Sequence, residues 1–98
     1  EVENVVGAHP AVKDVAVIGI PDEKWGEAVK AVVILHDEYS PSEELRKEIF
    51  DFCKDKIAGY KKPKSLDFIG DEEMPRTGTG KILHRALRER YGKWSDKQ

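Results

Sequence analysis

Lys81, a lysine in a glycine-rich turn, is the residue of this sequence best placed to do chemistry. It ends the stretch PRTGTGK, residues 75–81. An ammonium group on a flexible side chain binds phosphate or carboxylate groups, and glycine lets a backbone approach a ligand closely. The stretch raises the hypothesis of an anion-binding loop. The alternative is an ordinary surface turn with a solvated lysine.

A phosphate-binding P-loop is excluded at two positions of this stretch. That loop needs Gly, four residues, then Gly-Lys and Ser or Thr, because backbone amides cradle the phosphates and the hydroxyl binds magnesium. Pro75 stands at the first glycine position and Ile82 at the hydroxyl position. The lysine therefore needs another interpretation.

Residues that could bind a metal or form a disulfide are few and scattered. The sequence has a single cysteine, Cys53, and three histidines, His9, His36 and His84, without the spacing of zinc ligands. We therefore expect no metal site and no internal disulfide.

Length and composition indicate one small domain. The 98 residues, 39% of them hydrophobic, are enough for one core and too few for two. The sequence has no apolar run of membrane-spanning length, and it opens on the charged EVENVV rather than on a secretory signal. We expect a soluble, cytoplasmic domain over residues 1–91, followed by a flexible tail over residues 92–98.

The charge is distributed unevenly between the two halves of the chain. Residues 1–50 carry 5 Lys or Arg against 11 Asp or Glu, whereas residues 51–98 carry 12 against 8. A basic half can mark a surface that meets polyanions, although a charged face in solvent is the commoner explanation. A small nucleic-acid-binding module is one alternative, but the basic residues lack interleaved aromatic residues for base stacking. We therefore expect no nucleic-acid partner.

The elements that must position the turn follow from the spacing of apolar residues. Val2, Val5 and Val6 predict a short first helix that ends near Ala8. The apolar runs over residues 15–20 and 28–35 predict two buried strands, joined by a loop over residues 21–27.

A longer helix is predicted between Ser40 and Gly59. Ser40 and Glu43 form a capping-box pair, Pro41 takes the first helical position, and Gly59 is expected to end the helix in a left-handed conformation. The apolar residues of this segment fall on one face at helical spacing: Leu45, Ile49, Phe52, Cys53 and Ile57.

A third strand is predicted near residues 66–69, and the spacing of Leu83, Leu87 and Tyr91 predicts a last helix after Lys81. The predicted order is α-β-β-α-β-α, in which the long helix joins strands two and three by a right-handed, parallel crossover. We therefore expect an α+β fold with a small three-stranded sheet flanked by helices.

Three blocks of this sequence resemble the C-terminal domain of adenylate-forming enzymes, the family of acyl-CoA synthetases, peptide-synthetase adenylation domains and firefly-type luciferases. The blocks are residues 1–35, IAGYKKPKSLDFI and MPRTGTGKILHRALRE, in the right order and with the right gaps. The resemblance covers residues 1–91 and is closest to medium- and long-chain fatty acyl-CoA synthetases. An adenylation-domain fragment of a peptide synthetase or an aryl-CoA ligase is the alternative within the family.

The resemblance implies a role for Lys81. In this family a large N-terminal domain binds ATP and the carboxylic acid, and a small C-terminal domain closes over it with a lysine in the motif Pro, four residues, Gly-Lys. Pro75, Gly80 and Lys81 match this motif, with Thr79 beside the glycine. Lys81 is then expected to reach the carboxylate and the α-phosphate, where an ammonium can follow the charge that builds as pyrophosphate leaves.

The resemblance also implies a second half-reaction, in which the small domain rotates and the acyl group passes to a thiol. Basic residues around the end of the long helix are candidates to contact the phosphates of coenzyme A, first among them Lys54, Lys61 and Lys64. Ordinary solvated lysines are the alternative. His84 stands where relatives often carry Arg or Lys, which weakens a phosphate contact at that position. Trp25-Gly26-Glu27 matches a further family block, interpreted as loop architecture.

The partners implied by the resemblance are the N-terminal adenylation domain of the same enzyme, ATP with Mg²⁺, a fatty or other carboxylic acid, and coenzyme A. Some acyl-CoA synthetases are switched off by acylation of this lysine, so a protein acetyltransferase acting on Lys81 is a further expected partner. The sequence contains no ATP-binding loop, acyl pocket or hinge, so this domain alone is expected to have no turnover. A purely structural interaction domain is the remaining non-enzyme alternative.

Overall fold

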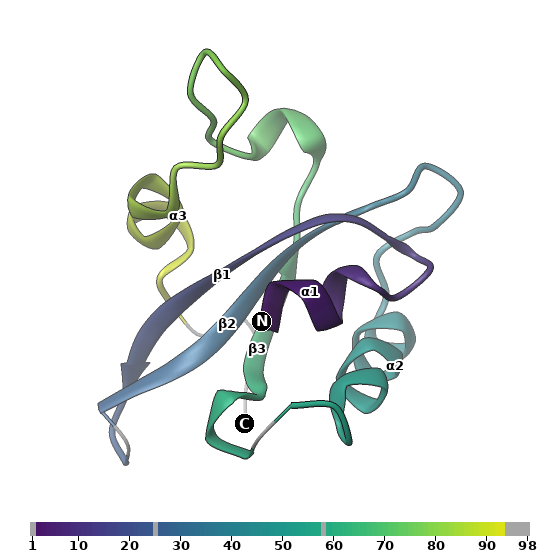
Figure 1. The fold of residues 1–98 in the computed structure, drawn as a ribbon, viewed down its shortest axis with the longest axis vertical. Coiled ribbons are helices and arrows are strands. Elements are labelled where there is room, and N and C mark those ends of the chain that lie inside the picture. The colour runs from purple at the N-terminus through teal and green to yellow at the C-terminus, as the bar shows by residue number, and fades with distance from the viewer. Residues whose placement is uncertain (1, 25, 58, 94–98) are drawn as a thin grey trace.

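The computed structural model describes residues 2–24, 26–57 and 59–93, which form a three-stranded sheet flanked by helices (Figure 1). The helices are α1 (Val2–Gly7), α2 (Glu43–Cys53) and α3 (His84–Tyr91), and the strands are β1 (Val12–Asp22), β2 (Gly26–Leu35) and β3 (Pro63–Phe68). Two short 3₁₀ helices, η1 (Gly59–Lys61) and η2 (Asp71–Glu73), lie on either side of β3 in the sequence. The predicted α+β class and the order α-β-β-α-β-α are confirmed.

Strand β2 occupies the centre of the sheet, between β1 and β3. It pairs with β1 in antiparallel fashion and with β3 in parallel fashion, so the predicted parallel crossover through the long helix is confirmed. Side chains on both sides of β2 are buried. This explains why β2 is apolar over most of its length rather than a strict alternation of apolar and polar residues.

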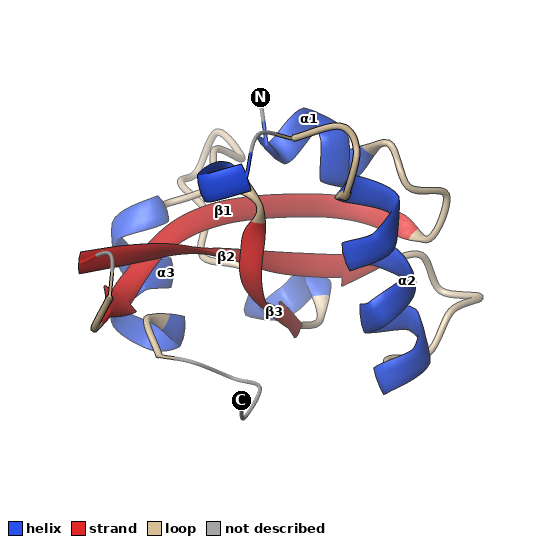
Figure 2. Ribbon diagram, turned by 90° about the horizontal axis from the view of Figure 1, so that it is seen from below, coloured by secondary structure: helices blue, strands red, loops and turns tan. Residues whose placement is uncertain are grey.

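Two hydrophobic clusters lie on the two faces of the sheet. One joins α1 and α2 to the sheet, and the other joins α3 to it. Val33 belongs to the first cluster and its neighbour Val32 to the second, because successive side chains of a strand point to opposite faces. Helix α1 lies above the strands in the view of Figure 2. The turn that carries Lys81 directly precedes α3, whose Leu87 belongs to the second cluster.

Strand β1 is longer than predicted, and the loop after it is shorter. Pro21 lies opposite Glu27 and Asp22 lies opposite Gly26, so four residues of the predicted loop belong to the strand pair. The prediction that Pro21 ends the strand is wrong because β1 is an edge strand, where proline is tolerated. Trp25 of the same predicted loop lies outside the described residues.

Helix α2 begins at a different serine from the predicted one. The Leu45 amide donates a hydrogen bond to Oγ of Ser42 at 3.0 Å, so Ser42 rather than Ser40 is the N-cap. Ser42 offers the same hydroxyl as Ser40, and it is followed directly by Glu43 and Glu44, whose charge favours the start of a helix.

The end of α2 also differs from the prediction, because the helix ends at Cys53 and not at Gly59. The Lys56 amide donates to the Cys53 carbonyl at 3.1 Å, so the chain continues in tighter turns that satisfy the last carbonyls. These turns still bring Ile57 into the core. Gly59 begins η1, and its φ is not positive, so the left-handed stop predicted there is wrong.

Candidate functional site

The turn that carries Lys81 is a hydrogen-bonded hairpin loop between η2 and α3. Arg76 and Ile82 form an isolated antiparallel bridge at its base. Thr77 closes the loop from inside, because its amide donates to the Lys81 carbonyl at 2.8 Å and its carbonyl accepts from the Gly80 amide at 2.9 Å. The Lys81 amide donates to Oγ1 of Thr77 at 3.1 Å. Both backbone polar groups of Lys81, the amide and the carbonyl, are therefore hydrogen-bonded to Thr77.

The other motif residues shape this loop. Gly80 has a φ of +93°, in the left-handed region that favours glycine, so the turn itself requires glycine at this position. The hydroxyl of Thr79 lies 2.9 Å from that of Thr77, and Pro75 is buried at the base of the hairpin. The motif thus builds a defined loop around one chemically active group, the ammonium of Lys81.

The side chain of Lys81 is exposed, and among the described residues no hydrogen bond or ion pair holds its ammonium group. The loop residues from Thr77 to Gly80 are exposed as well. An anion can therefore approach Lys81 without displacing an internal carboxylate. Chemically, this arrangement can neutralise a carboxylate or a phosphate oxygen presented from outside the domain.

The lysines predicted to contact coenzyme A lie on other elements. Lys54 follows the last residue of α2, Lys61 ends η1, and Lys64 is exposed in β3. Figure 1 shows the end of α2, η1 and the start of β3 at the opposite end of the molecule from the hairpin that precedes α3. The structure does not bring these lysines together with Lys81. It presents two separate basic regions.

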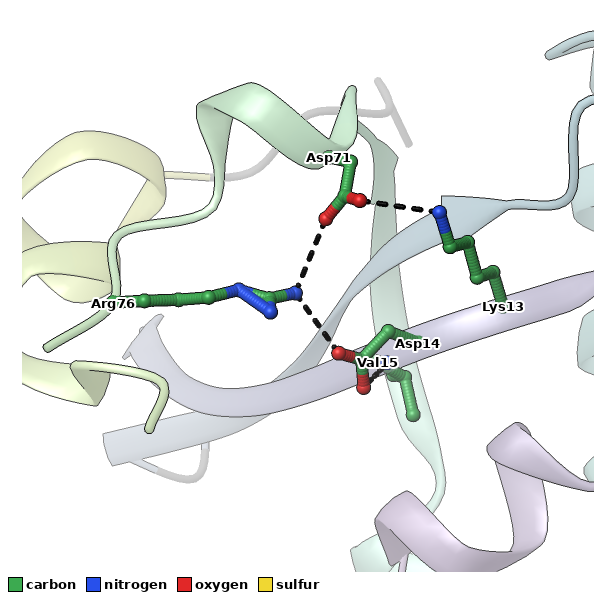
Figure 3. A network of polar contacts seen from close by, with 5 residues as sticks. All are labelled: Lys13, Asp14, Val15, Asp71 and Arg76. Carbon is green, nitrogen blue, oxygen red and sulfur yellow. Dashed lines mark hydrogen bonds and ion pairs between the residues drawn. The ribbon is translucent and has the colours of Figure 1, made fainter. Parts of the chain in front are cut away.

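An ion-pair network at the base of the hairpin was missed by sequence reasoning (Figure 3). Nη2 of Arg76 lies 3.0 Å from Oδ2 of Asp14 and 3.3 Å from Oδ1 of Asp71, and Nζ of Lys13 lies 3.1 Å from Oδ2 of Asp71. We call Lys13, Asp14, Asp71 and Arg76 the Arg76 network. Asp14 lies 62 positions from Arg76, so no local pattern connects them. The only available signal was an arginine directly after the motif proline.

A second missed feature is a buried lysine in the central strand. Lys30 of β2 is 1% exposed, and its Nζ lies 2.6 Å from Oδ2 of Asp67. The same ammonium donates to the carbonyls of Tyr91 at 2.8 Å and Lys93 at 2.6 Å. Its three donors are thus matched by three acceptors, which tie β2 to β3 and to the end of α3. The signal in the sequence was a lysine inside an otherwise apolar run.

His84 contacts the first helix. Its Nε2 lies 3.0 Å from Oε2 of Glu3, which also accepts a hydrogen bond from the Val17 amide at 2.9 Å. Burial raises the pKa of Glu3, but the hydrogen bonds from His84 and Val17 outweigh burial and leave that pKa below its ordinary value of 4.5. His84 thus links the start of α3 to α1 and to the edge strand β1.

Two further findings concern residues 2–24, 26–57 and 59–93, the part of the chain that the structure describes. In this part of the chain, no three His, Cys, Asp or Glu side chains gather as a metal site would require. None of its helices has the length and apolar character needed to cross a membrane.

Comparison with known proteins gives consistent matches. The model of the AMP-binding enzyme C-terminal domain matches residues 1–81. Long-chain-fatty-acid–CoA ligase FadD13 of Mycobacterium tuberculosis is 46% identical over 91 residues, which are 93% of this chain and 17% of that protein. Fatty acid–[acyl-carrier-protein] ligase ScoC of Streptomyces coeruleorubidus is 40% identical over 96 residues, 98% of this chain and 17% of that protein.

Solved structures agree with these sequence matches. The structure of a Mycobacterium tuberculosis fatty acyl CoA synthetase has a TM-score of 0.79 to this chain at 44% sequence identity, covering 94% of this chain and 17% of that one. The chain therefore spans 17% of the length of FadD13 and of ScoC.

Proposed function

Because the chain belongs to the AMP-binding enzyme C-terminal domain family, we propose that it is the small closing domain of an ATP-dependent, AMP-forming acid–CoA ligase of the fatty acyl-CoA synthetase type. The observation that carries the proposal is the exposed ammonium of Lys81, which pairs with no described residue, on a hydrogen-bonded, glycine-dependent hairpin. We take the functional domain to be residues 1–91. Its principal partner is the N-terminal adenylation domain of the same enzyme.

Lys81 is assigned to the adenylation step. In that step a carboxylate oxygen of the acid attacks the α-phosphorus of ATP, and the bond to pyrophosphate breaks. Negative charge then grows on the α-phosphate oxygens and on the leaving pyrophosphate. An ammonium aimed at these oxygens stabilises the transition state more than the separated substrates. We place the acid, most of the contacts to ATP, and its Mg²⁺ on the N-terminal domain.

The second half-reaction is assigned to the other end of the domain. Lys54, Lys61 and Lys64 provide positive charge for the phosphates of coenzyme A. Their separation from the hairpin in Figure 1 supports a domain that turns between the two steps, since one orientation cannot present both ends to the same site. The name of ScoC makes the thiol of an acyl carrier protein the second candidate acceptor.

Lys81 is also proposed as a site of regulation by a protein acetyltransferase. Its exposed amine is accessible to an acylating enzyme, and acylation removes the charge that the adenylation step uses. Loss of adenylation in proportion to the fraction of acylated Lys81 supports this regulation. Full activity of an enzyme that is fully acylated at Lys81 contradicts it.

The experiment that tests the function compares Lys81→Ala in the full-length enzyme with Lys47→Ala, a change of an exposed lysine on α2. Lys81→Ala is expected to lower acid-dependent ATP–pyrophosphate exchange by about 10²–10³-fold, the scale of losing one transition-state donor. Transfer from supplied acyl-adenylate to coenzyme A is expected to stay near the normal rate. Lys47→Ala is expected to change neither step.

Two outcomes contradict the assignment. Equal losses in the two half-reactions indicate that Lys81 acts through folding or through the domain interface. An unchanged exchange rate in the Lys81→Ala enzyme favours the structural interaction domain instead. Repeating the transfer step with coenzyme A and with a carrier protein carrying its phosphopantetheine thiol identifies the acceptor.

A further inference from the structure

The direction in which the Lys81 hairpin points depends on its base, because the described residues at its tip are exposed rather than packed into the core. The residues from Thr77 to Lys81 are all exposed. At the base, Pro75 is buried, and Ile82 packs against the hydrophobic cluster beneath α3. Arg76 is the charged residue of this base, opposite Ile82 in the antiparallel bridge. A rotation of the chain at Arg76 is therefore transmitted directly to the strand that carries Lys81.

The guanidinium group of Arg76 is held from two directions. Nη2 lies between Oδ2 of Asp14, at 3.0 Å, and Oδ1 of Asp71, at 3.3 Å. Asp14 belongs to β1 and Asp71 to η2, so the contacts join the hairpin to the sheet and to the 3₁₀ helix before it (Figure 3). Two anchors on different elements restrict both the position and the rotation of the group that they hold.

Asp14 is itself oriented by the backbone. Its Oδ1 accepts a hydrogen bond from the Val15 amide at 2.9 Å, which leaves Oδ2 for Arg76. The register of β1 against β2 shifts between Val12 and Asp14, which leaves Lys13 as an extra residue. Such a bulge re-aims side chains, and in Figure 3 Lys13 reaches Asp71 while Asp14 reaches Arg76. Strand β1 thus holds the Asp14 carboxylate in an orientation that lets it pair with Arg76 at the base of the hairpin.

Stability alone is a poor explanation for these contacts. The side chains of Arg76, Asp14 and Asp71 are 29%, 41% and 51% exposed, and ion pairs this exposed contribute little to folding. Nε of Arg76 is buried without a hydrogen-bond partner among the described residues, which is unfavourable. A buried donor of this kind lowers the free energy of unfolding. A geometric role accounts for its presence better than an energetic one.

We propose that Arg76 is a positioning residue for Lys81: its contacts with Asp14 and Asp71 fix the base of the hairpin and thereby aim the ammonium at the reacting phosphate. This inference rests on the proposed adenylation role of Lys81. Arg76 touches no substrate in this scheme and acts only through the lysine. A displacement of about 1 Å in a catalytic group can lower a rate by about 10²-fold, so a loosened base has a measurable effect.

The test uses the full-length enzyme and a double-mutant cycle between Arg76→Met and Lys81→Ala. Arg76→Met is expected to lower the maximal rate of acid-dependent ATP–pyrophosphate exchange by about 10- to 10²-fold, with a smaller change in KM for ATP. In the Lys81→Ala background the same change is expected to cost no more than about 2-fold, because a residue that acts through Lys81 has nothing left to position. Arg76→Lys is expected to restore part of the rate.

Arg46→Met is the matched control. Arg46 lies on α2, donates to the Leu66 carbonyl and pairs with Glu43, so it is a partly buried, ion-paired arginine away from the hairpin. Its replacement is expected to leave the exchange rate unchanged apart from any loss of folded enzyme. Hydrogen–deuterium exchange of the peptide covering residues 75–83 is expected to quicken in Arg76→Met and to stay unchanged in Arg46→Met.

The outcomes separate the two proposals. If Lys81→Ala lowers exchange but Arg76→Met has the same fold effect with and without Lys81, the positioning role is wrong and the adenylation role stands. Unchanged hydrogen exchange over residues 75–83 in Arg76→Met also overturns the positioning role. If Lys81→Ala alone leaves exchange at the normal rate, the adenylation role fails, and the positioning role fails with it.

Discussion

Lys30 and Lys81 carry the same ammonium group in opposite surroundings. Lys30 lies in the central strand at 1% exposure, with its donors directed at the Asp67 carboxylate and at the carbonyls of Tyr91 and Lys93. Lys81 lies at an exposed hairpin, and no described side chain or carbonyl pairs with its ammonium. The ammonium of Lys30 is bound by acceptors inside the domain, whereas the ammonium of Lys81 is accessible to a ligand.

The difference shows how surroundings rather than residue type decide what a lysine does. A buried ammonium is stable only when acceptors surround it, and those acceptors then prevent it from binding a ligand. An unpaired ammonium contributes little to folding but can respond to charge brought by a substrate. Each lysine therefore predicts a different phenotype, and substitutions at the two positions test the comparison directly.

The largest expected effect on stability is that of Lys30→Met in the 98-residue chain. The change leaves the Asp67 carboxylate, whose side chain is 20% exposed, without the Lys30 cation, and removes the hydrogen bonds that this ammonium donates to the carbonyls of Tyr91 and Lys93. Breaking a buried ion pair from one side costs about 3–5 kcal/mol. We expect a loss of this size in the free energy of unfolding, measured by urea denaturation.

Lys81→Met is the matched control for that experiment. Since its ammonium pairs with none of the described residues, the free energy of unfolding is expected to stay within about 0.5 kcal/mol of the parent chain. Comparable losses in the two variants, or a loss below about 1 kcal/mol in Lys30→Met, show that burial and pairing do not distinguish the two lysines.

A smaller effect is expected from the basic residues at the opposite end of the domain. Replacing Lys54, Lys61 or Lys64 by Ala in the full-length enzyme removes a candidate contact to the phosphates of coenzyme A. We expect the KM for coenzyme A to rise by about 10-fold for a contacting lysine, the scale of one charge-assisted hydrogen bond. Adenylation, measured by pyrophosphate exchange, is expected to be unchanged. A loss of pyrophosphate exchange in these variants indicates that both basic regions act in adenylation. It contradicts the separation of their roles inferred from Figure 1.

The smallest expected effect concerns Glu3 and its contact with His84. Because the pKa of Glu3 is lower in the folded chain than its ordinary value of 4.5, its ionised form stabilises the fold above that value. This stability is lost as the pH falls through about 4.5 and on through the lower folded pKa. At 42% side-chain exposure the contribution stays below about 1 kcal/mol.

The measurement compares Glu3→Gln with the parent chain by thermal unfolding across pH. We expect Glu3→Gln to be less stable at about pH 6 and the difference to shrink below about pH 4, where the parent carboxylate is protonated as well. A difference that grows on acidification has the wrong sign for a depressed pKa and rejects the assignment.

Errors in the predicted elements arose where two local signals competed. Ser40 and Ser42 both offer a capping hydroxyl, and only the packed helix shows that the Leu45 amide meets the second. Gly59 favours a left-handed helix end, but tighter turns after Cys53 end the helix earlier while Ile57 still reaches the core. These choices depend on which register buries most apolar surface, a property of the whole fold.

The sequence by itself determined the strand and helix order, the sheet as a buried layer, and the motif in which Lys81 stands, because apolar spacing and turn chemistry act over a few neighbouring residues. Only the tertiary structure decided which charges meet. Arg76 finds Asp14 across 62 positions, and Lys30 finds the Tyr91 carbonyl across 61. Those contacts arise because strand pairing and helix packing bring distant segments together, and no local pattern of residues specifies which side chains then face each other.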